Sequence, residues 1–333
     1  MSIRLTPGKI AGLKAVSDER GVIAAAALDQ RDLLKRMIAR VRGGGEVADS
    51  EVIEFKKVVA NVLTRYASSI LLDVEYGLPA SKSINSKGLL LAYEKSGYDA
   101  RGPEKLPTLT EGWSVQRLKE AGADCVKILL FYTQFEQSSF NEQKKAWVER
   151  IGSECRAVDI PLFLELLAYS PNGGDESGLE YAKQKPEIVR HFMEEFSKDR
   201  YGADVLKLES PVQMSYVEGT QAYKGIRAYT RAEAMDILRS TAAATDKPIV
   251  YLSAGISHDG FIEMLQLALE SGVQFHGVLG GRANWQDGIP AFVQGGAAAL
   301  QKWLETTGVE NVQKVNEVLR SAQPWYSARS MQG

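Results

Sequence analysis

Short apolar runs alternate with longer amphipathic segments along the whole chain. Each run is continuously hydrophobic, which is typical of parallel strands that are covered on both faces. The eight runs lie at residues 22–28, 69–73, 89–93, 125–132, 162–168, 205–208, 248–254 and 275–279. Residues 89–93 are the least distinctive strand candidate, and the pattern alone leaves their structure open.

The segments between these runs have the periodicity of amphipathic helices. Apolar residues recur at helical spacing in three sets: Ile53, Val58, Val62 and Tyr66; Trp147, Ile151 and Cys155; and Ile188, Phe192 and Phe196. Ser114 is placed to cap a short helix that ends at Gly122, and Gly272 to end the helix before the eighth run. Eight strands joined by helical crossovers predict an α/β fold, a single (β/α)8 TIM barrel. A doubly wound open sheet is the competing interpretation.

No linker, low-complexity tract or repeat divides the chain, so we predict one barrel domain over residues 1–333. Residues 1–17 form an N-terminal lead-in to it, and the tail at 321–333 is expected to be partly disordered. The segment Ser-Pro-Asn-Gly-Gly-Asp-Glu-Ser at 170–177 follows a predicted strand. It can cover a site at the carboxyl end of the barrel or be a surface loop without a role, and the sequence leaves both interpretations open.

Composition narrows the cellular setting and the partners. The chain of 333 residues carries a formal net charge of -2, so it has no general attraction for nucleic acid. Its two cysteines, Cys125 and Cys155, lie in apolar stretches and are expected to be buried thiols in a reducing compartment. Residues 1–5 lack a signal-peptide pattern, and no apolar run approaches the roughly 18 residues that span a bilayer. We therefore predict a cytoplasmic protein without a membrane partner.

Three charged residues interrupt the predicted strands. Lys127 lies in Cys-Val-Lys-Ile-Leu-Leu, Glu165 in Leu-Phe-Leu-Glu-Leu-Leu and Lys207 in Val-Leu-Lys-Leu-Glu. Burying an unpaired charge costs several kcal/mol, so these side chains need partners. Because catalytic residues of barrels come from the ends of different strands, charges in three successive strands predict an active site. A structural cluster of buried salt bridges is the alternative.

Further carboxylates end or follow other strands. Asp29 ends the first strand, where barrels place active-site groups, but it could equally cap the helix that follows. Asp73 and Glu75 follow the second strand and rank lower, because a lone carboxylate there is more often a cap or a loop contact. Glu209 shares strand parity with Lys207 and can pair with a neighbour at the rim.

Two glycine-bearing segments end the seventh and eighth predicted strands, Leu-Ser-Ala-Gly at 252–255 and Leu-Gly-Gly-Arg at 279–282. Barrels often bind phosphate in these two loops, where backbone N–H groups are free. Glycine permits close approach of the backbone, a serine hydroxyl donates, and an arginine binds two oxygens at once. The loops therefore predict a phosphate site at Ser253, Gly255, Gly281 and Arg282, with simple turn chemistry as the alternative.

The histidines do not suggest a metal centre. His191, His258 and His276 are the three in the chain, and none shows metal-ligand spacing. We expect His191 at or near the surface and His258 in a solvated loop. Two lysines in a low-dielectric pocket repel each other, which lowers the pKa of one and frees a neutral amine for attack on a carbonyl.

Several uncommon segments follow one another in a distinctive order. They are Ala-Leu-Asp-Gln-Arg (27–31), Leu-Leu-Asp-Val-Glu-Tyr-Gly-Leu-Pro-Ala (71–80), Leu-Leu-Leu-Ala-Tyr-Glu-Lys-Ser-Gly-Tyr-Asp (89–99), Glu-Arg-Ile-Gly-Ser-Glu-Cys (149–155), Tyr-Leu-Ser-Ala-Gly (251–255) and Gly-Arg-Ala-Asn-Trp (281–285). In these segments the chain resembles the bacterial class I tagatose 1,6-bisphosphate aldolases, from about residue 18 to about residue 320. The resemblance makes residues 89–93 the third strand of the barrel.

The resemblance also implies roles for individual residues. The family's Schiff-base lysine corresponds to Lys207 in Val-Leu-Lys-Leu-Glu-Ser-Pro, and its general acid/base glutamate to Glu165 in Phe-Leu-Glu. A second active-site lysine corresponds to Lys127, and the aspartate of the Asp-Gln-Arg motif to Asp29. Positions that contact the substrate or its phosphate match Gln30, Ser253 and Arg282.

By this resemblance, Lys207 attacks the C2 carbonyl of a ketohexose bisphosphate while Glu165 shuttles protons. Lys127 keeps Lys207 partly unprotonated, and Asp29 positions hydroxyls near the scissile bond. The products expected are dihydroxyacetone phosphate and glyceraldehyde 3-phosphate, formed without a metal or an organic cofactor. The expected partners are a small ketose phosphate and, as is ordinary for such enzymes, further copies of the chain in a homo-oligomer.

The sequence leaves other functions open. A related class I aldolase could act on another ketose phosphate, such as a sulfo-sugar phosphate or a stereoisomeric ketohexose bisphosphate. A sugar-phosphate-sensing regulator could retain the same fold. Asp32, Gly280 and the segment at 133–140 depart from the family pattern, which commonly has glycine at the first of these positions and cysteine at the second. These departures flank the expected site, so they bear on the sugar more than on the reaction.

Overall fold

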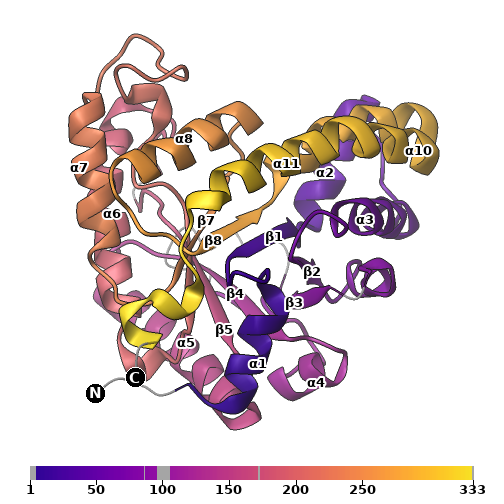
Figure 1. Cartoon of the computed structure of the whole chain (residues 1–333), viewed down its shortest axis with the longest axis horizontal. Helices are drawn as coiled ribbons and strands as arrows, with labels where there is room; N and C mark the ends of the chain where they lie inside the picture. The colour runs from indigo at the N-terminus through magenta and orange to yellow at the C-terminus, as the bar shows by residue number, and fades with distance from the viewer. Residues whose placement is uncertain (1–4, 86, 96–105, 172, 332–333) are drawn as a thin grey trace.

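The computed structural model describes residues 5–85, 87–95, 106–171 and 173–331. Eight parallel strands pair in sequence order, and β8 pairs with β1 to close a barrel (Figure 1). The strands are β1 (Ile23–Leu28), β2 (Ser69–Asp73), β3 (Gly88–Ala92), β4 (Cys125–Phe131), β5 (Leu162–Leu167), β6 (Val205–Leu208), β7 (Ile249–Leu252) and β8 (Gly277–Gly280). The predicted TIM barrel is confirmed. The least distinctive strand candidate, residues 89–93, corresponds to β3. Residues 96–99 of the family-like segment at 89–99 lie outside the described residues.

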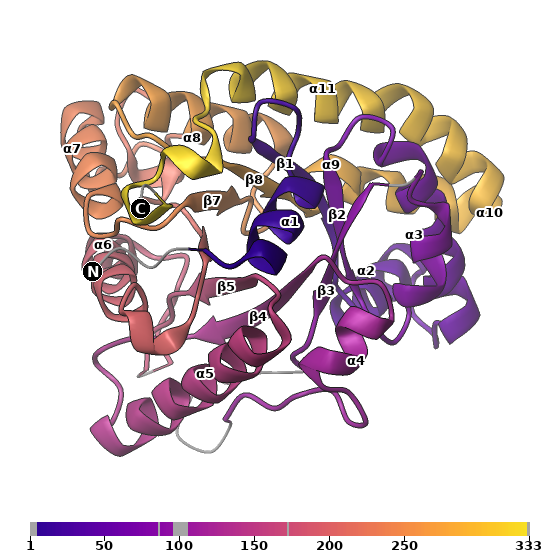
Figure 2. The ribbon, with the colours of Figure 1, turned by 60° about the horizontal axis from the view of Figure 1, so that its bottom comes forward.

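Helices follow the strands and surround the barrel (Figures 1 and 2). They are α2 (Asp32–Arg42), α3 (Asp49–Leu63), α4 (Val115–Glu120), α5 (Ser138–Val158), α6 (Leu179–Phe196), α7 (Arg231–Ala242), α8 (His258–Glu270), α9 (Arg282–Trp285), α10 (Ile289–Trp303) and α11 (Val309–Val318). Two helix boundaries follow the predicted signals. The hydroxyl of Ser114 accepts a hydrogen bond from the backbone N–H of Arg117 at the start of α4, and α8 ends just before Gly272, which has a φ of 81°.

Helix α3 buries a different face from the one predicted. Tyr66 lies beyond its end and is 41% exposed, while Ile53 and Val58 are only half-buried. The buried apolar residues are Val52, Phe55, Val59, Ala60, Val62 and Leu63. Apolar residues surround more than half of this helix, so spacing alone does not identify the inner face. The ring of Phe55 decides it by packing edge-on against the rings of Trp285 and Phe292.

Helix α1 (Pro7–Val16) and the C-terminal tail close the N-terminal end of the barrel, where Figure 2 shows them side by side. Leu13 and Val16 of α1 and Trp325 of the tail pack in one cluster with the inward-facing residues of the strands. The backbone N–H of Trp325 also donates to the carbonyl of Gly21 at 2.9 Å. These contacts differ from the partial disorder expected of the tail, because burial of a large aromatic ring holds it in place. Residues 332–333 lie outside the described residues.

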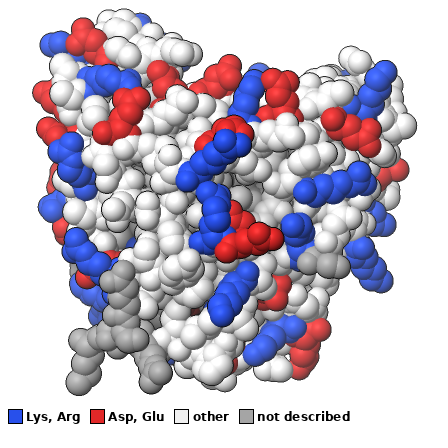
Figure 3. All heavy atoms as spheres, viewed as in Figure 1, with Lys and Arg blue, Asp and Glu red and all other residues white. Residues whose placement is uncertain are grey.

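The surface carries both signs of charge. Basic and acidic side chains are interspersed over the face shown in Figure 3, without an extended area of one sign. None of the helices in the described ranges is both long enough and apolar enough to cross a membrane.

Candidate active site

A cavity of about 750 Å³ opens at the carboxyl ends of the strands. This is the end at which TIM barrels carry their active sites. Eight of the nine residues predicted for the site line it: Asp29, Gln30, Lys127, Glu165, Lys207, Ser253, Gly281 and Arg282. The ninth, Gly255, is exposed and is not among the lining residues. The segment at 170–177 contributes no residue from its described part, so of the two interpretations left open, this cavity does not support the one as a cover.

Lys127, in β4, lies at the centre of the acidic cluster of the cavity. Its ammonium is 2.8 Å from Asp29, 2.7 Å from Glu94 and 2.7 Å from Glu165, and the residue is 1% exposed. Burial alone would lower the pKa of Lys127, but the three carboxylates outweigh it and raise this pKa well above its ordinary value. The three carboxylates therefore favour the charged form of Lys127.

Glu165 connects the two lysines. One oxygen, Oε2, lies 2.7 Å from the ammonium of Lys127 and 2.9 Å from that of Lys207. Glu165 and Lys207 are register partners in β5 and β6, so both side chains point into the barrel at the same level. The pair is almost completely buried, with Lys207 3% exposed. This arrangement allows a proton to pass directly between the amine and the carboxylate.

Asp29 belongs to the site and is not a helix cap. Helix α2 begins at Asp32, and its N-terminus has no side-chain capping bond. Burial would raise the pKa of the Asp29 carboxyl, but Lys127 and Lys207 outweigh it and hold this pKa well below its usual range. Gln30 donates to the other oxygen of Asp29 at 3.2 Å. The carboxylate is thus ionised and its orientation is fixed.

The two glycine-bearing loops meet at Arg282. A Cβ at Gly255, where φ is 81°, would lie 2.7 Å from Nη1 of Arg282, so the guanidinium packs on the backbone of this glycine. Burial lowers the pKa of Arg282, while Glu165 and Asp29 act in the opposite direction. No described residue hydrogen-bonds to this guanidinium or lies within ion-pair distance of it. Together with the buried Ser253, it forms a position suited to a bound phosphate.

The family model described as DeoC/LacD family aldolase matches residues 23–287. This chain belongs to that family. Tagatose 1,6-diphosphate aldolase 2 of Enterococcus faecalis is 47% identical over 98% of both chains. Tagatose 1,6-diphosphate aldolase 1 of the same organism is 49% identical over 93% of this chain and 94% of its own length. The tagatose 1,6-diphosphate aldolase of Listeria monocytogenes is 48% identical over 98% of this chain and 96% of its own.

A solved structure resembles this aldolase-family chain in fold alone. It is fructose-bisphosphate aldolase from Plasmodium falciparum, in complex with TRAP and a small-molecule inhibitor. The two chains superpose with a TM-score of 0.68 at 13% identity, over 96% of this chain and 97% of the other.

The lower-ranked acidic candidates of this DeoC/LacD family member have structural partners. Asp73 forms a fully buried ion pair with Lys56 of α3, and Glu209 pairs with Lys185 at 2.5 Å. Glu209 also accepts the backbone N–H of Ala168 at 2.6 Å, so it stabilises the rim as the sequence indicated. Glu75 is a partly exposed rim residue that lies 3.8 Å from Arg31.

The histidines lie outside the cavity lining. His191 is half-buried and stacks in parallel on Tyr132, as expected. The solvated loop expected for His258 is wrong: it is buried as the first residue of α8, because the loop after β7 is short. Burial lowers the pKa of His276 to about 4, and its Nδ1 accepts the N–H of Ile249 at 3.1 Å. Among the described residues, no group of three His, Cys, Asp or Glu side chains is arranged to hold a metal ion.

Glu94 is a residue of the cavity that the sequence analysis missed in this aldolase-family barrel. It follows β3, pairs with Lys127, and its second oxygen accepts the backbone N–H of Leu129 at 3.2 Å. Strand parity would have found it, because Leu90 and Ala92 face the barrel interior and the next residue of that parity is Glu94. Arg31 holds the Glu94 backbone by donating to its carbonyl at 2.8 Å.

Proposed function

We propose that the chain is a class I aldolase that cleaves D-tagatose 1,6-bisphosphate, or a stereoisomeric ketohexose bisphosphate. The products are dihydroxyacetone phosphate and D-glyceraldehyde 3-phosphate. The observation that carries the proposal is the single Glu165 oxygen at 2.9 Å from Lys207 and 2.7 Å from Lys127. The activity for which relatives at 47% and 49% identity are named supports the same reaction.

The reaction begins at the amine of Lys207. It transfers its proton to Glu165 and attacks the C2 carbonyl. Glu165 then returns the proton to the carbinolamine hydroxyl, which leaves as water and gives an iminium ion with Glu165 ionised again. Glu165 then accepts the C4 hydroxyl proton, the C3–C4 bond breaks, and its electron pair neutralises the iminium to give an enamine. Glyceraldehyde 3-phosphate leaves, the enamine is protonated at C3, and hydrolysis releases dihydroxyacetone phosphate with free Lys207.

The other side chains of the site position the substrate. Lys127 remains cationic and donates to a substrate hydroxyl, and Asp29 orients the hydroxyls beside the scissile bond. The C1 phosphate lies against Arg282 and Ser253, within reach of the backbone at Gly281, while Gly255 seats the guanidinium. Lys127 and Asp29 are held by their ion pair, and Arg282 packs on Gly255, before substrate arrives, which lowers the ordering cost of binding.

We also propose that residues 1–333 act as one domain, that the enzyme is a homo-oligomer, and that it works in the cytoplasm. The single barrel spans 98% of the length of a curated relative, which supports one domain. Cys125 and Cys155 are both free and buried, which fits a reducing compartment. Size-exclusion chromatography with light scattering tests the oligomer.

The experiment that tests the reaction is trapping of the Schiff base. The protein is incubated with dihydroxyacetone phosphate and reduced with borohydride, and peptide mapping locates the added mass. We expect one adduct, on Lys207, which Lys207→Ala abolishes and Lys224→Ala, at an exposed position, retains. An adduct on Lys127 would reverse the roles of the two lysines. Absence of any adduct on a protein that binds the compound would reject class I chemistry.

A further inference from the structure

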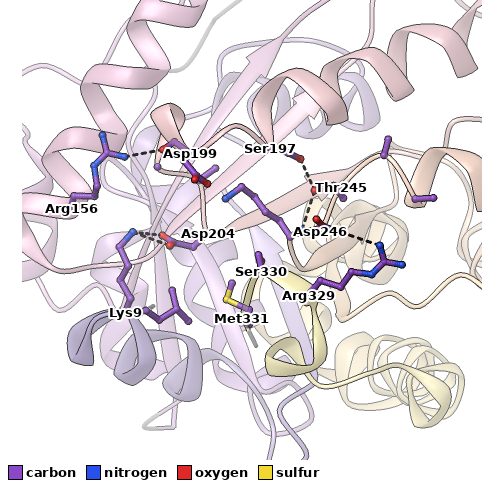
Figure 4. A pocket seen from close by; sticks show the side chains of 16 residues that line it. Lys9, Arg156, Ser197, Asp199, Asp204, Thr245, Asp246, Arg329, Ser330 and Met331 are labelled. Carbon is purple, nitrogen blue, oxygen red and sulfur yellow. Dashed lines mark hydrogen bonds and ion pairs between the residues drawn. The ribbon is translucent and has the colours of Figure 1, made fainter. Parts of the chain in front are cut away.

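A second cavity, of about 500 Å³, lies at the opposite, N-terminal end of the barrel. The tail, α1 and the loop between α7 and β7 surround it, together with the 3-10 helix η2 (Asp199–Tyr201). Figure 4 shows Lys9, Asp204, Asp199 and Arg156 along one side of it and Thr245, Asp246 and Arg329 along the other. None of these residues lines the active-site cavity.

Most charged side chains of this second cavity already have partners of opposite charge or backbone acceptors. Lys9 donates to both oxygens of Asp204 at 2.8 Å, and both side chains are buried. Arg329 lies 3.4 Å from Asp246. Arg156 donates to the backbone carbonyl of Asp199 at 3.3 Å and also contacts the carbonyl of Arg200. These contacts hold the walls of the cavity together.

Lys247, directly before β7, is the exception. Its ammonium makes no hydrogen bond and no ion pair with any residue that the structure describes, although the side chain is half-buried. Burial lowers the pKa of Lys247, while Asp204 and Asp199 act from a distance in the opposite direction. The hydroxyl of Ser330, on the same cavity wall, is buried and likewise has no partner among the described residues.

A half-buried ammonium without a protein partner is available to an anion, which it can bind through a charge-assisted hydrogen bond. Two unused donors in one cavity call for a ligand with acceptor oxygens. The volume falls within the range of small-molecule sites, about 300–1,000 Å³. Asp199 and Asp204 lie close by and would repel a ligand with several negative groups.

We propose that this cavity is a second, non-catalytic binding site for a small metabolite that carries one oxyanion group, a phosphate ester or a carboxylate, bound to Lys247. The two cavities lie at opposite ends of the barrel, so both can be occupied at once. The proposal is independent of the reaction assigned to the active-site cavity.

Hydrogen exchange measured by mass spectrometry on the full chain tests the site and distinguishes binding there from binding in the active-site cavity. Inorganic phosphate is added in one series and acetate in another, which distinguishes the two sources of the oxyanion. We expect slower exchange in peptides that cover 243–247 and 197–204 in at least one series. Protection confined to 253–256 and 281–283, or no protection in either series, would overturn the proposal.

Three variants show whether the charge of Lys247 is responsible. Lys247→Gln should weaken the binding measured at 243–247 by about tenfold or more, because it removes a charge-assisted hydrogen bond. Lys247→Arg keeps the charge and should retain binding, and Lys224→Gln changes only an exposed lysine and should match the wild type. Equal affinities of the Gln and Arg variants would reject Lys247 as the ligand-binding group, and a folded Arg variant keeps the test valid if the Gln variant unfolds.

Discussion

The charges around Glu165 are arranged so that a proton can move at little electrostatic cost. Asp29, Glu94 and Glu165 carry three negative charges, and Lys127 and Lys207 carry two positive ones in contact with them. Transfer of a proton from Lys207 to Glu165 removes one charge of each sign, so the net charge of the buried cluster does not change. Large solvation penalties for a charge change in a low-dielectric site are thereby avoided.

At the scale of single residues, we also derive a prediction from the contact between Gly255 and Arg282. Gly255→Ala places a methyl group where the guanidinium lies, so Arg282 must move away from the phosphate position. We expect KM for the bisphosphate to rise about tenfold, with a smaller change in kcat, because charge-assisted hydrogen bonds to the phosphate weaken. Steady-state kinetics with purified variants measures both constants.

Gly225→Ala is the matched control for this substitution. Gly225 has a φ of 86°, close to the 81° of Gly255, but nothing lies within 4 Å of a Cβ there. Both variants therefore carry a similar backbone strain, of about 1–3 kcal/mol. Only Gly255→Ala should raise KM; an equal rise in both variants would show that strain, and not the position of Arg282, is the cause.

Some site residues could be predicted from the sequence and others could not, depending on where they lie relative to the strands. Lys127, Glu165 and Lys207 stand out because a charge within an apolar strand is rare and needs a buried partner. Glu94 was missed because it follows a strand whose last residue the pattern does not define. His258 was placed in solvent because its burial depends on α9 and α11, whose packing over the start of α8 cannot be read from local sequence.

At the scale of elements, a buried lysine joins α5 to the ends of two strands. Lys144 is fully buried; it donates to the carbonyl of Phe131 at the end of β4, at 2.9 Å, and to the hydroxyl of Tyr169 after β5, at 3.0 Å. That hydroxyl donates in turn to Glu136 at 2.8 Å. Burial lowers the pKa of Lys144 to about 8, against the weaker opposing effect of Glu136.

This lowered pKa predicts how stability depends on pH. Below about pH 8 the lysine is charged in both states, and burial of the charge reduces stability by a constant amount. Between about pH 8 and about pH 10, the unfolded chain still holds the proton that the folded chain has lost, so the free energy of unfolding rises with pH. Urea denaturation at a series of pH values should show this rise in the wild type and a flatter profile in Lys144→Met.

The control for this measurement is Gln143→Met, which introduces the same side chain at an exposed position of α5 without removing a titratable group. It should retain the wild-type profile. If the profile of Lys144→Met is parallel to that of the wild type, other titratable groups cause the rise in the free energy of unfolding.

Elements were more predictable from the sequence than their faces. Seven strands were predicted from the pattern, because a short, continuous apolar run bounded by polar residues is typical of a buried parallel strand. The third strand was assigned through the family resemblance, since its run is short. The inner face of α3 was misassigned, because its apolar residues cover more than half of the helix and contacts with α9 and α10 decide which are buried. Tertiary contacts of this kind are not encoded in local periodicity.

At the scale of the whole molecule, the two ends of the barrel have different tasks. The carboxyl end holds the charged site, and the N-terminal end is closed by an apolar plug of Leu13, Val16 and Trp325. Asp204 connects this end to the catalytic strands: it accepts the N–H of Leu162 at the start of β5 at 2.8 Å and directly precedes β6. The same two strands carry Glu165 and Lys207, so the hydrogen bond at their N-terminal ends helps to fix the register of this pair.

This division predicts that stability and catalysis can be separated by substitution. Trp325→Ala removes a ring that is 5% exposed and leaves a cavity under the barrel, at a cost of about 3–5 kcal/mol in the free energy of unfolding. Tyr326→Ala removes a neighbouring ring that is 53% exposed and should cost less than about 1 kcal/mol. Urea denaturation measures both values.

Far below the denaturation midpoint, kcat and KM of both variants should equal those of the wild type, since neither ring reaches the active-site cavity. A large fall in kcat for folded Trp325→Ala would show that the plug positions Glu165 and Lys207 along the strands as well as stabilising the barrel.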